Sequence, residues 1–381
     1  MESKKNVLFV IPNLCGGGAE RQVTYLVNGL DRTQFNIFLY LFENKGVFKE
    51  NLKKDVHLLS TPDVVNSFFS RIPFVRQFIH IPFLIWWIRK HKIQVINSRM
   101  WMPAIIVYLS LLFLRRKEKI KFYPVDDCFP EKDLSLIQTR FTKGKRFLVK
   151  KAYQSSSKLV SISNEMTKSF CSFYSLSKND IVTIYNGIDL THFAFKSKAI
   201  KKNHPFRLLS VGRLNPQKGF DLLIQAVHDL AQKDCKISVT ILGDGLEREN
   251  LLKLKQECNL SDEMLLIRPF TSDIVKEFYE HDLYVLSSRY EGLVLILMEA
   301  LASGIPIVAT NCKSGPAEIL DNGRCGLLVQ SESPLAIAKG IVDAINDYPC
   351  FIERSKLGRK FVEDHFDINA TIRKFESLFA Q

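Results

Sequence analysis

Short apolar runs alternate along the chain with longer segments whose apolar residues recur at helical spacing. The apolar runs are residues 7–11, 37–41, 95–97, 121–125, 159–163, 208–211, 237–242, 265–267, 283–286, 307–309 and 327–329. A helical pattern follows the first run of each half, at residues 19–30 and 222–230. Buried strands that alternate with helices are typical of parallel sheets wrapped by helices. The pattern therefore predicts an α/β protein with two doubly wound, Rossmann-like domains that face each other across a cleft.

The pattern lapses once, in a polar and basic stretch between residues 186 and 206, before the same alternation starts again. We therefore expect an N-terminal domain at 1–190, a linker at 191–205 and a C-terminal domain at 206–360. Residues 361–381 have the apolar spacing of a terminal amphipathic helix, which we expect to pack back on the first domain. A length of 381 residues is ample for two domains of this size.

Composition excludes several classes of protein. With 46% hydrophobic and 24% charged residues, the chain is neither disordered nor fibrous. Its eight cysteines form no C-x-x-C pair, which argues against a zinc module and a redox motif and favours a reduced, cytoplasmic setting. No apolar run followed by a small-residue cleavage site stands near the N-terminus, so we expect no signal peptide.

The net charge of +13 is concentrated in the first half of the chain. Residues 1–200 carry 31 Lys and Arg against 15 Asp and Glu, whereas residues 201–381 carry 22 against 25. Within the first half, residues 68–121 hold eleven cations and one acid, interleaved with apolar and aromatic runs. This mixture favours peripheral contact with an anionic membrane surface. Buried helices with solvated ends remain an alternative, and nucleic acid is disfavoured because no recognisable DNA or RNA module is present.

Gly16, Gly17 and Gly18 lie between the first strand and the first helix. Their N–H groups can approach an anion at the helix N-terminus. A tight turn without a ligand is the alternative. The third glycine of the dinucleotide fingerprint G-x-G-x-x-G would fall at Arg21, so an NAD-dependent dehydrogenase is disfavoured.

Arg213 and Lys218 lie in the loop that follows the strand at 208–211. Ligands of open parallel sheets bind at this end of the strands, and two cations on one short loop suit a diphosphate. A solvated loop is the alternative, because exposed Lys and Arg are common.

Glu291 and Glu299 are eight positions apart, the first in a glycine loop after the strand at 283–286 and the second in an apolar helix. A carboxylate with so many apolar neighbours requires a partner, and ligand hydroxyl groups are suitable ones. Alternatively, Glu291 caps the helix and Glu299 forms a surface ion pair.

The segment from Glu291 to Glu299 resembles the E-x7-E signature of retaining glycosyltransferases of family 4, whose GT-B fold has two Rossmann-like domains. Four further segments are similar to that family in spacing and order: 185–189, 211–219, 242–245 and 315–320. The resemblance covers essentially the whole chain and is tightest from 185 to 330. Several motifs in one order are far more specific than any of them alone.

The resemblance implies a role for each motif. Arg213 and Lys218 would bind the diphosphate of the donor, Glu299 the ribose hydroxyls and Glu291 the transferred sugar. The amides of Gly292, Leu293 and Val294 would point at sugar or phosphate. Gly243 and Asp244 would line the nucleotide pocket. Gly16, Gly17 and Gly18 would close the phosphate side from the first domain, which would bind the acceptor.

One position departs from the family pattern. The family commonly has a His near the tip of a first-domain strand, beside the transferred sugar, whereas this chain has Asp126 and Asp127 there. Either aspartate is a candidate for part of that role, and Asp126 is the one we select. An ordinary turn acid is the alternative.

These observations predict a glycosyltransferase that moves a hexose or N-acetylhexosamine, with retention, from a nucleotide-diphosphate sugar, UDP being preferred. The expected acceptor is a glycan or polyprenyl-linked glycan of cell-surface polysaccharide biosynthesis, and the expected location is the inner face of the cell membrane. No cofactor or metal is expected, because the chain has no D-x-D triplet. The alternatives are a nucleotide-sugar 2-epimerase on the same fold and a basic, non-enzymatic binding protein.

Overall fold

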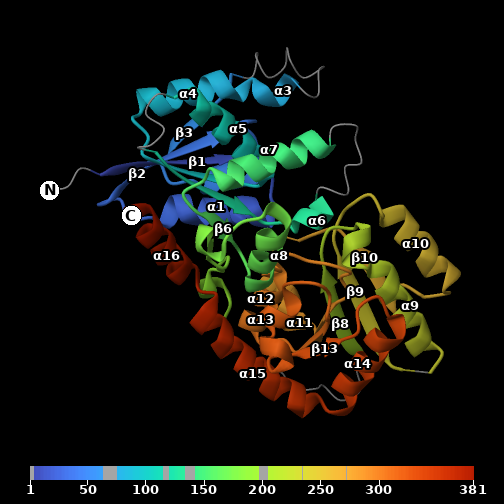
Figure 1. Cartoon of the computed structure of the whole chain (residues 1–381). Coiled ribbons are helices and arrows are strands. Elements are labelled where there is room, and N and C mark those ends of the chain that lie inside the picture. Colours follow the sequence, from blue (N-terminus) through green and yellow to red (C-terminus); the bar gives the residue numbers. More distant parts are fainter. Residues whose placement is uncertain are drawn as a thin grey trace. The chain divides into compact units, whose positions relative to one another are not determined.

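The computed structural model describes residues 4–62, 75–114, 120–133, 142–196, 205–233, 235–271 and 273–381. The chain divides into two compact units (Figure 1). The first unit comprises Met1–Gly187 and Ile368–Gln381, and the second comprises Ile188–Asp367. Each unit contains one fully parallel sheet, which confirms the predicted fold class of two doubly wound α/β domains.

The sheet of the first unit has seven strands in the order β3-β2-β1-β4-β5-β6-β7. The strands are β1 (Lys5–Ile11), β2 (Phe35–Leu41), β3 (His57–Ser60), β4 (Val95–Arg99), β5 (Lys121–Asp126), β6 (Leu159–Ser161) and β7 (Ile181–Thr183). The strand order reverses between β1 and β4. In doubly wound sheets the loops at the carboxyl ends of such a strand pair form the ligand site.

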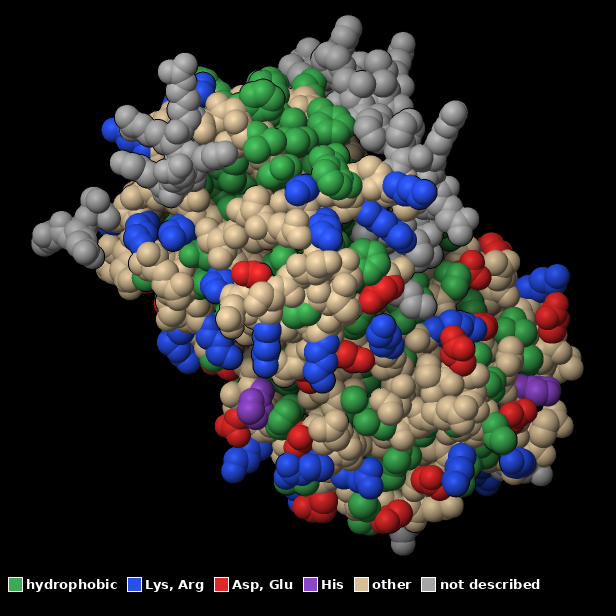
Figure 2. All heavy atoms as spheres, in the orientation of Figure 1, with side chains coloured by type: hydrophobic (Ala, Val, Ile, Leu, Met, Phe, Trp, Pro, Cys, Tyr) green, Lys and Arg blue, Asp and Glu red, His purple; other side chains and the backbone are tan. Residues whose placement is uncertain are grey.

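Helices cover both faces of this sheet. They are α1 (Gly18–Gly29), α3 (Val75–Phe78), α4 (His80–Lys90), α5 (Trp101–Leu112), α6 (Pro130–Asp133), α7 (Thr142–Gln154) and α8 (Asn164–Tyr174), with the single turns η1 (Val47–Asn51) and η3 (Lys178–Asp180). A further turn, η4 (Leu190–His192), belongs to the second unit. Helix α5 packs between α4 and α7. The outer surface of these three helices carries a cluster of hydrophobic side chains, near the top of Figure 2.

The last helix of the chain, α16 (Ile368–Ala380), belongs to the first unit and packs against α1. Phe379 is fully buried among aromatic rings of the sheet, with ring centroids 6.0 Å from Phe9 and 5.8 Å from Tyr123. A Cβ on Gly29 of α1 would lie 2.2 Å from Ile372, so the two helices touch at a glycine. The chain terminus thus completes the core of the unit in which the chain begins.

The sheet of the second unit has six strands in the order β10-β9-β8-β11-β12-β13. The strands are β8 (Phe206–Val211), β9 (Ile237–Leu242), β10 (Leu265–Arg268), β11 (Leu283–Leu286), β12 (Ile307–Thr310) and β13 (Leu327–Val329). The helices are α9 (Phe220–Ala231), α10 (Arg248–Glu257), α11 (Ile274–Glu280), α12 (Leu295–Ser303), α13 (Pro316–Ile319), α14 (Pro334–Asn346) and α15 (Tyr348–His365), with the turns η5 (Pro216–Lys218) and η6 (Asp321–Gly323). Its core is formed by apolar residues of β8, β9 and β11 against α9 and α14. The strand order reverses between β8 and β11, which places a second candidate ligand site after these two strands.

All the strands predicted from the apolar runs are present, and two strands were missed, β3 and β7. Both lie at the edges of their sheet and have three or four residues. Their side chains are only partly buried, so their sequences lack a continuous apolar run. Short edge strands of this kind leave little periodic signal.

The segment from Phe193 to Lys196 follows the surface of the second unit. The backbone oxygen of Phe193 accepts a hydrogen bond from Arg359, and that of Ala194 accepts one from the Tyr279 hydroxyl at 2.5 Å. Residues 197–204 of the predicted linker lie outside the described residues. The part of the predicted linker that is described therefore packs on the second unit.

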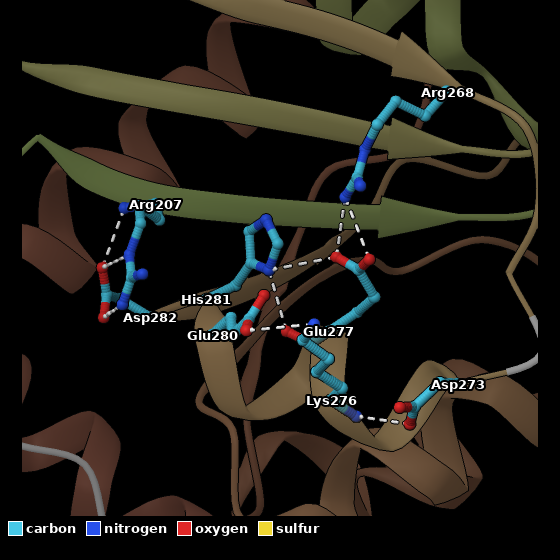
Figure 3. A network of polar contacts seen from close by, with 8 residues as sticks. All are labelled: Arg207, Arg268, Asp273, Lys276, Glu277, Glu280, His281 and Asp282. Atoms are coloured by element: carbon cyan, nitrogen blue, oxygen red, sulfur yellow. Dashed lines mark hydrogen bonds and ion pairs between the residues drawn. The ribbon is translucent and has the colours of Figure 1, made fainter.

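A polar network around the buried Glu277 and His281 ties α11 to the second sheet (Figure 3). Arg268, at the end of β10, donates hydrogen bonds to both carboxylate oxygens of Glu277, at 3.0 and 2.8 Å. His281 Nδ1 lies 2.8 Å from the Glu277 backbone oxygen, to which only an N–H can donate. Burial lowers the pKa of His281 below its usual range, so the imidazole is neutral near pH 7.

Candidate functional site

In the second unit, the loops that follow β8 and β11 are joined by hydrogen bonds. Arg289 N donates to the Gln217 backbone oxygen at 2.8 Å, and Ser287 Oγ donates to the Lys218 backbone oxygen at 2.9 Å. Gln217 Nε2 donates to the Tyr290 backbone oxygen at 3.0 Å. These bonds fix the two loops to each other at the point where the strand order reverses.

Glu291 is the centre of this arrangement. Its Oε1 accepts hydrogen bonds from Lys218 Nζ at 2.6 Å and from Ser288 Oγ at 2.5 Å. Its Oε2 accepts one from Gln217 Nε2 at 3.3 Å. The carboxylate is 6% exposed, so the positive charge of Lys218 compensates a buried negative charge. Sequence reasoning selected Lys218 and Glu291 but missed Gln217 and Ser288, which lie beside them in the same two motifs.

Arg213 lies in the same loop as Lys218 but has a different environment. Its side chain is exposed, and it forms no ion pair or hydrogen bond with the part of the chain that the structure describes. Lys218 keeps two further N–H donors besides the one that Glu291 uses. The loop after β8 therefore offers an unpaired guanidinium together with an ammonium group that can bind a second anion.

The backbone of Gly292, Leu293 and Val294 leads into α12, whose N-cap is Val294. Their amides donate no hydrogen bond to any acceptor among the described residues. Amides at a helix N-terminus attract negative charge. A Cβ on Gly315 would lie 2.2 Å from the Gly292 backbone oxygen, so the loop after β12 holds this segment in place.

Glu299 lies on α12 and is only 3% exposed. Both acidic residues lie near the buried Tyr284 of β11. Burial raises the pKa of the Tyr284 phenol, and the negative charges of Glu291 and Glu299 raise it further. Burial and the charge of Glu291 likewise raise the pKa of Cys312 to about 12. The E-x7-E pair therefore concentrates negative charge in the interior, where hydroxyl groups of a ligand can donate hydrogen bonds to it.

Gly243 and Asp244 follow β9 and pack against the loop after β8. A Cβ on Gly243 would lie 1.9 Å from the Gly212 backbone oxygen, which only a glycine allows. The Asp244 backbone oxygen accepts a hydrogen bond from Leu214 N at 2.9 Å, and its carboxylate accepts one from Phe270 N at 3.1 Å. This turn thus borders the same carboxyl edge as Arg213 and Lys218.

Gly16, Gly17 and Gly18 belong to the first unit, where they follow β1 and open α1. Gly16 has a φ of +111°, which L side chains rarely adopt. None of the three amides donates a hydrogen bond within the described residues. The loop therefore has the geometry of an anion-binding helix N-terminus.

Asp126 ends β5 of the first unit and Asp127 follows it, and both carboxylates accept hydrogen bonds. Asp126 accepts hydrogen bonds from Tyr153 Oη at 2.7 Å and from Cys128 N at 3.2 Å. Asp127 accepts two hydrogen bonds from the buried Arg99. A catalytic role of Asp126 stays a prediction.

The stretch at 68–121 is described for residues 75–114 and for 120 and 121; residues 68–74 and 115–119 lie outside the described part. Residues 104–107 of α5 are fully buried and form core. Trp86, Leu112 and Phe113 are at least half exposed. Among the described helices, none is both long enough and apolar enough to span a bilayer. The described residues also contain no group of three His, Cys, Asp or Glu placed to hold a metal ion.

Two family models match adjoining parts of the chain. The model described as Glycosyltransferase Family 4 matches residues 16–192, and the model described as Glycosyl transferases group 1 matches residues 192–362. Together they cover residues 16–362, which include most of both units.

Two curated proteins are similar over different lengths. The chain is 26% identical over 342 residues to the N-acetylgalactosamine-N,N'-diacetylbacillosaminyl-diphospho-undecaprenol 4-alpha-N-acetylgalactosaminyltransferase of Campylobacter jejuni, which covers 88% of this chain and 89% of that protein. It is 33% identical over 187 residues to an uncharacterized glycosyltransferase of Haemophilus influenzae, which covers 49% of this chain. That match spans about half of the relative, 52% of its length.

Solved structures share the fold over nearly the whole chain. Anabaena Alr3699/HepE in complex with UDP has a TM-score of 0.78 at 18% identity, covering 98% of this chain and 99% of that one. Sucrose-phosphate synthase from Thermosynechococcus elongatus has a TM-score of 0.80 at 16% identity, covering 99% of both chains. At these identities the likeness concerns the fold alone.

Proposed function

Since this chain belongs to glycosyltransferase family 4 and has the GT-B fold, we propose that it transfers a hexose or N-acetylhexosamine from a UDP-sugar to a glycan or lipid-linked acceptor. We propose further that the transfer retains the anomeric configuration and serves cell-surface polysaccharide biosynthesis. The observation that carries the proposal is the contact of Lys218 Nζ with Glu291 Oε1 at 2.6 Å, at the reversal of the strand order.

The proposed chemistry follows from the charges at this edge of the sheet. When the bond between the sugar C1 and the diphosphate oxygen breaks, positive character develops on the sugar and negative charge on the leaving diphosphate. Arg213, Lys218 and the amides at the start of α12 stabilise the leaving group, since fixed donors cost no reorganisation during the reaction. The acceptor hydroxyl then bonds to C1, and its proton passes to the oxygen of the leaving diphosphate.

The remaining residues bind the donor. Glu291 accepts hydrogen bonds from hydroxyls of the transferred sugar, and Glu299 accepts them from the ribose. Gly243 and Asp244 line the nucleotide pocket. For the first unit, we assign phosphate binding to Gly16, Gly17 and Gly18 and a catalytic role to Asp126.

Three observations support the choice of donor. Solved structures with the same fold contain UDP and UDP-glucose. The similar Campylobacter protein is named as an N-acetylgalactosaminyltransferase. In this chain, Ser314 precedes Gly315, which packs on the Gly292 backbone, and the Ser314 Oγ is buried without a hydrogen-bond partner among the described residues. We assign this hydroxyl to the acetamido group of an N-acetylhexosamine donor.

We also propose that the enzyme needs no metal ion. The chain has no D-x-D triplet, the usual carboxylate clamp for a diphosphate-bound metal. Arg213 and Lys218 neutralise the diphosphate instead. Transfer activity should therefore persist in the presence of a chelator.

The proposed acceptor is polyprenyl-linked, with the enzyme held at the inner face of the cell membrane. The name of the Campylobacter relative includes a diphospho-undecaprenol acceptor. The exposed Trp86, Leu112 and Phe113 of the first unit support contact with a membrane surface.

The test is to measure UDP-sugar hydrolysis and transfer in Lys218→Ala and Glu299→Ala variants. Loss of one fixed donor at the leaving group typically lowers the rate by a factor on the order of 10²–10³, which we expect for Lys218→Ala. Glu299→Ala should mainly raise the KM for the donor. Lys253→Ala is a suitable control, because this lysine is 77% exposed on α10.

Melting curves establish that the variants are folded, and a rise in melting temperature with UDP-, GDP- or ADP-sugars identifies the donor. Full activity of both folded variants would end the proposal. Conversion of the donor sugar without any acceptor would instead favour a nucleotide-sugar 2-epimerase.

A further inference from the structure

The protein already uses most of the hydrogen-bonding capacity of the Glu291 carboxylate. A carboxylate offers about four lone-pair sites, two on each oxygen. Lys218 Nζ and Ser288 Oγ fill both sites on Oε1, and Gln217 Nε2 fills one site on Oε2. The described part of the chain supplies no further donor to this carboxylate. One acceptor site on Oε2 therefore remains for a ligand.

The side-chain amide of Gln217 donates both of its N–H groups to the protein. Nε2 donates to the Tyr290 backbone oxygen at 3.0 Å and to Glu291 Oε2 at 3.3 Å. The amide oxygen Oε1 is an acceptor. No described residue donates a hydrogen bond to it, and the side chain is partly exposed. Gln217 Oε1 is thus a second acceptor that a ligand can reach, next to the free site on Glu291.

The loop after β11 anchors the turn that carries Gln217. The Gln217 backbone oxygen accepts a hydrogen bond from Arg289 N at 2.8 Å, and Arg289 Nη1 donates to the Pro216 backbone oxygen at 2.9 Å. The Arg289 guanidinium also forms a two-point ion pair with Asp221, at 2.7 and 2.6 Å. The amide of Gln217 is therefore preorganised, which lowers the entropy cost of binding a ligand through it.

We propose that Gln217 is a specificity-determining residue, which together with Glu291 recognises the hydroxyl pattern of the transferred sugar. Glu291 Oε2 accepts a hydrogen bond from one hydroxyl, and Gln217 Oε1 accepts one from another. Both groups are acceptors at these sites, so they select donors. A sugar without a hydroxyl at either site leaves an acceptor unpaired, which lowers its use as a substrate. This inference rests on the proposed function, since it specifies the sugar contact assigned there to Glu291.

The two acceptors suit hydroxyls on adjacent ring carbons, because the groups that carry them are hydrogen-bonded to each other. In an N-acetylhexosamine the acetamido group occupies C2, so the adjacent ring hydroxyls are those on C3 and C4. The direction of the C4 hydroxyl is then the feature that this pair of residues reads. Epimers at C4 should differ strongly as donors.

A merely structural role of Gln217 would give a different result. Loss of a bond between the two loops would lower stability and would weaken the binding of UDP as much as that of UDP-sugars. Loss of a sugar contact changes the ratio between donors that differ in one hydroxyl. It leaves the affinity for UDP unchanged, because UDP has no sugar at this site.

The test is to measure kcat and KM with UDP-N-acetylglucosamine and UDP-N-acetylgalactosamine, which differ only in the direction of the C4 hydroxyl. For a hexose donor, the same comparison uses UDP-glucose and UDP-galactose. Wild type should prefer one epimer by a factor on the order of 10–100 in kcat/KM. Gln217→Met has a side chain of similar length without the amide, and its preference should be smaller by a factor of about 10. Its Kd for UDP, measured by calorimetry, should equal that of wild type.

A second variant, Gln217→Glu, keeps the shape of the side chain but replaces its donors by an acceptor. Two carboxylates would then repel each other, so activity should be low at pH 8. Relative to wild type at the same pH, it should recover towards pH 5, where a protonated carboxyl group again donates to Glu291. Gln256→Met and Gln256→Glu are matched controls, because Gln256 is exposed on α10. Melting curves establish that all variants are folded.

Equal use of both epimers by wild type would overturn the inference. So would an unchanged preference in folded Gln217→Met, or a loss of affinity for UDP as large as that for the UDP-sugars. These results would leave the proposed function intact. Absence of transfer and hydrolysis by wild type with every UDP-sugar would instead contradict the proposed function and the inference with it.

Discussion

Arg99 and Asp127 form a two-point ion pair at the carboxyl edge of the first sheet. Arg99 Nε donates to Asp127 Oδ2 at 2.6 Å, and Nη2 donates to Oδ1 at 2.5 Å. Nη2 also donates to Asn186 Oδ1 at 2.5 Å, and the Arg99 side chain is 1% exposed. The guanidinium thus joins the ends of β4 and β5 to the segment that leads out of the first unit.

We predict that Arg99→Met destabilises the protein strongly. Breaking a buried ion pair from one side leaves the other charge uncompensated, which typically costs about 3–5 kcal/mol. Chemical denaturation of the full chain measures the change in the free energy of unfolding. The double variant Arg99→Met/Asp127→Asn should recover part of the loss, because no unpaired charge remains. A double variant less stable than the sum of both single changes would contradict this explanation.

We predict that Gly315→Ala lowers both stability and donor turnover. Gly315 has a φ of +86°, and its Cβ would lie 2.2 Å from the Gly292 backbone oxygen. Strain of this kind costs on the order of 1–3 kcal/mol, and relief of the clash would displace the amides of residues 292–294.

Gly323→Ala is the matched control for this variant. Gly323 has a φ of +95°, but its Cβ would meet nothing closer than Leu328 at 3.9 Å. It should therefore lose stability from backbone strain and keep its turnover. Equal loss of turnover in both variants would show that the position of the Gly292 segment does not determine turnover.

We predict that the protein loses stability as the pH falls below the ordinary imidazole pKa of about 6.5. Burial lowers the pKa of folded His281, and the nearby Arg207 and Arg268 lower it further, while Glu277 opposes them. The unfolded chain therefore binds a proton in a pH range in which the folded one does not, and stability is lost as the pH falls through that range.

The His281→Asn variant tests this prediction, because an amide nitrogen can still donate to the Glu277 backbone oxygen but does not titrate. Unfolding in urea between pH 5 and pH 8 should give a flatter stability profile for the variant than for wild type. If wild type and the variant had identical profiles of stability against pH, other titratable groups would cause the loss of stability in acid.

We predict that Cys312 is alkylated far more slowly than Cys15 and Cys128. Burial and the charge of Glu291 raise the pKa of Cys312 to about 12, whereas Cys15 and Cys128 are exposed. The raised pKa keeps Cys312 almost wholly in the unreactive thiol form at pH 8, and burial also limits its access to the reagent. Peptide mapping after timed reaction with iodoacetamide measures the rates. Glu291→Gln should accelerate the reaction of Cys312, and an unchanged rate would show that the Glu291 charge does not act there.

Much of the fold could be predicted from the sequence because burial leaves a local periodic signal. Strands buried on both faces read as continuous apolar runs, and helices such as α9 repeat their apolar residues at helical spacing. The edge strands β3 and β7 escaped prediction because their partly exposed side chains lack that signal.

The candidate site was predicted as motifs, but its geometry was not. Lys218 and Glu291 are 73 positions apart in the chain. Their loops meet because β8 pairs with β11, and local sequence patterns do not predict which strands pair. The same holds for Arg99 and Asp127, whose contact depends on the pairing of β4 with β5.

The sequence by itself determined two α/β halves, the order of their motifs and the acidic and basic residues of the candidate site. Each of these follows from a pattern of residues that lie close together in the chain. Only the tertiary structure decided which loops meet, which carboxylates are compensated and which cations are left unpaired. Those outcomes depend on strand order and packing, and both arise from contacts between residues far apart in the chain.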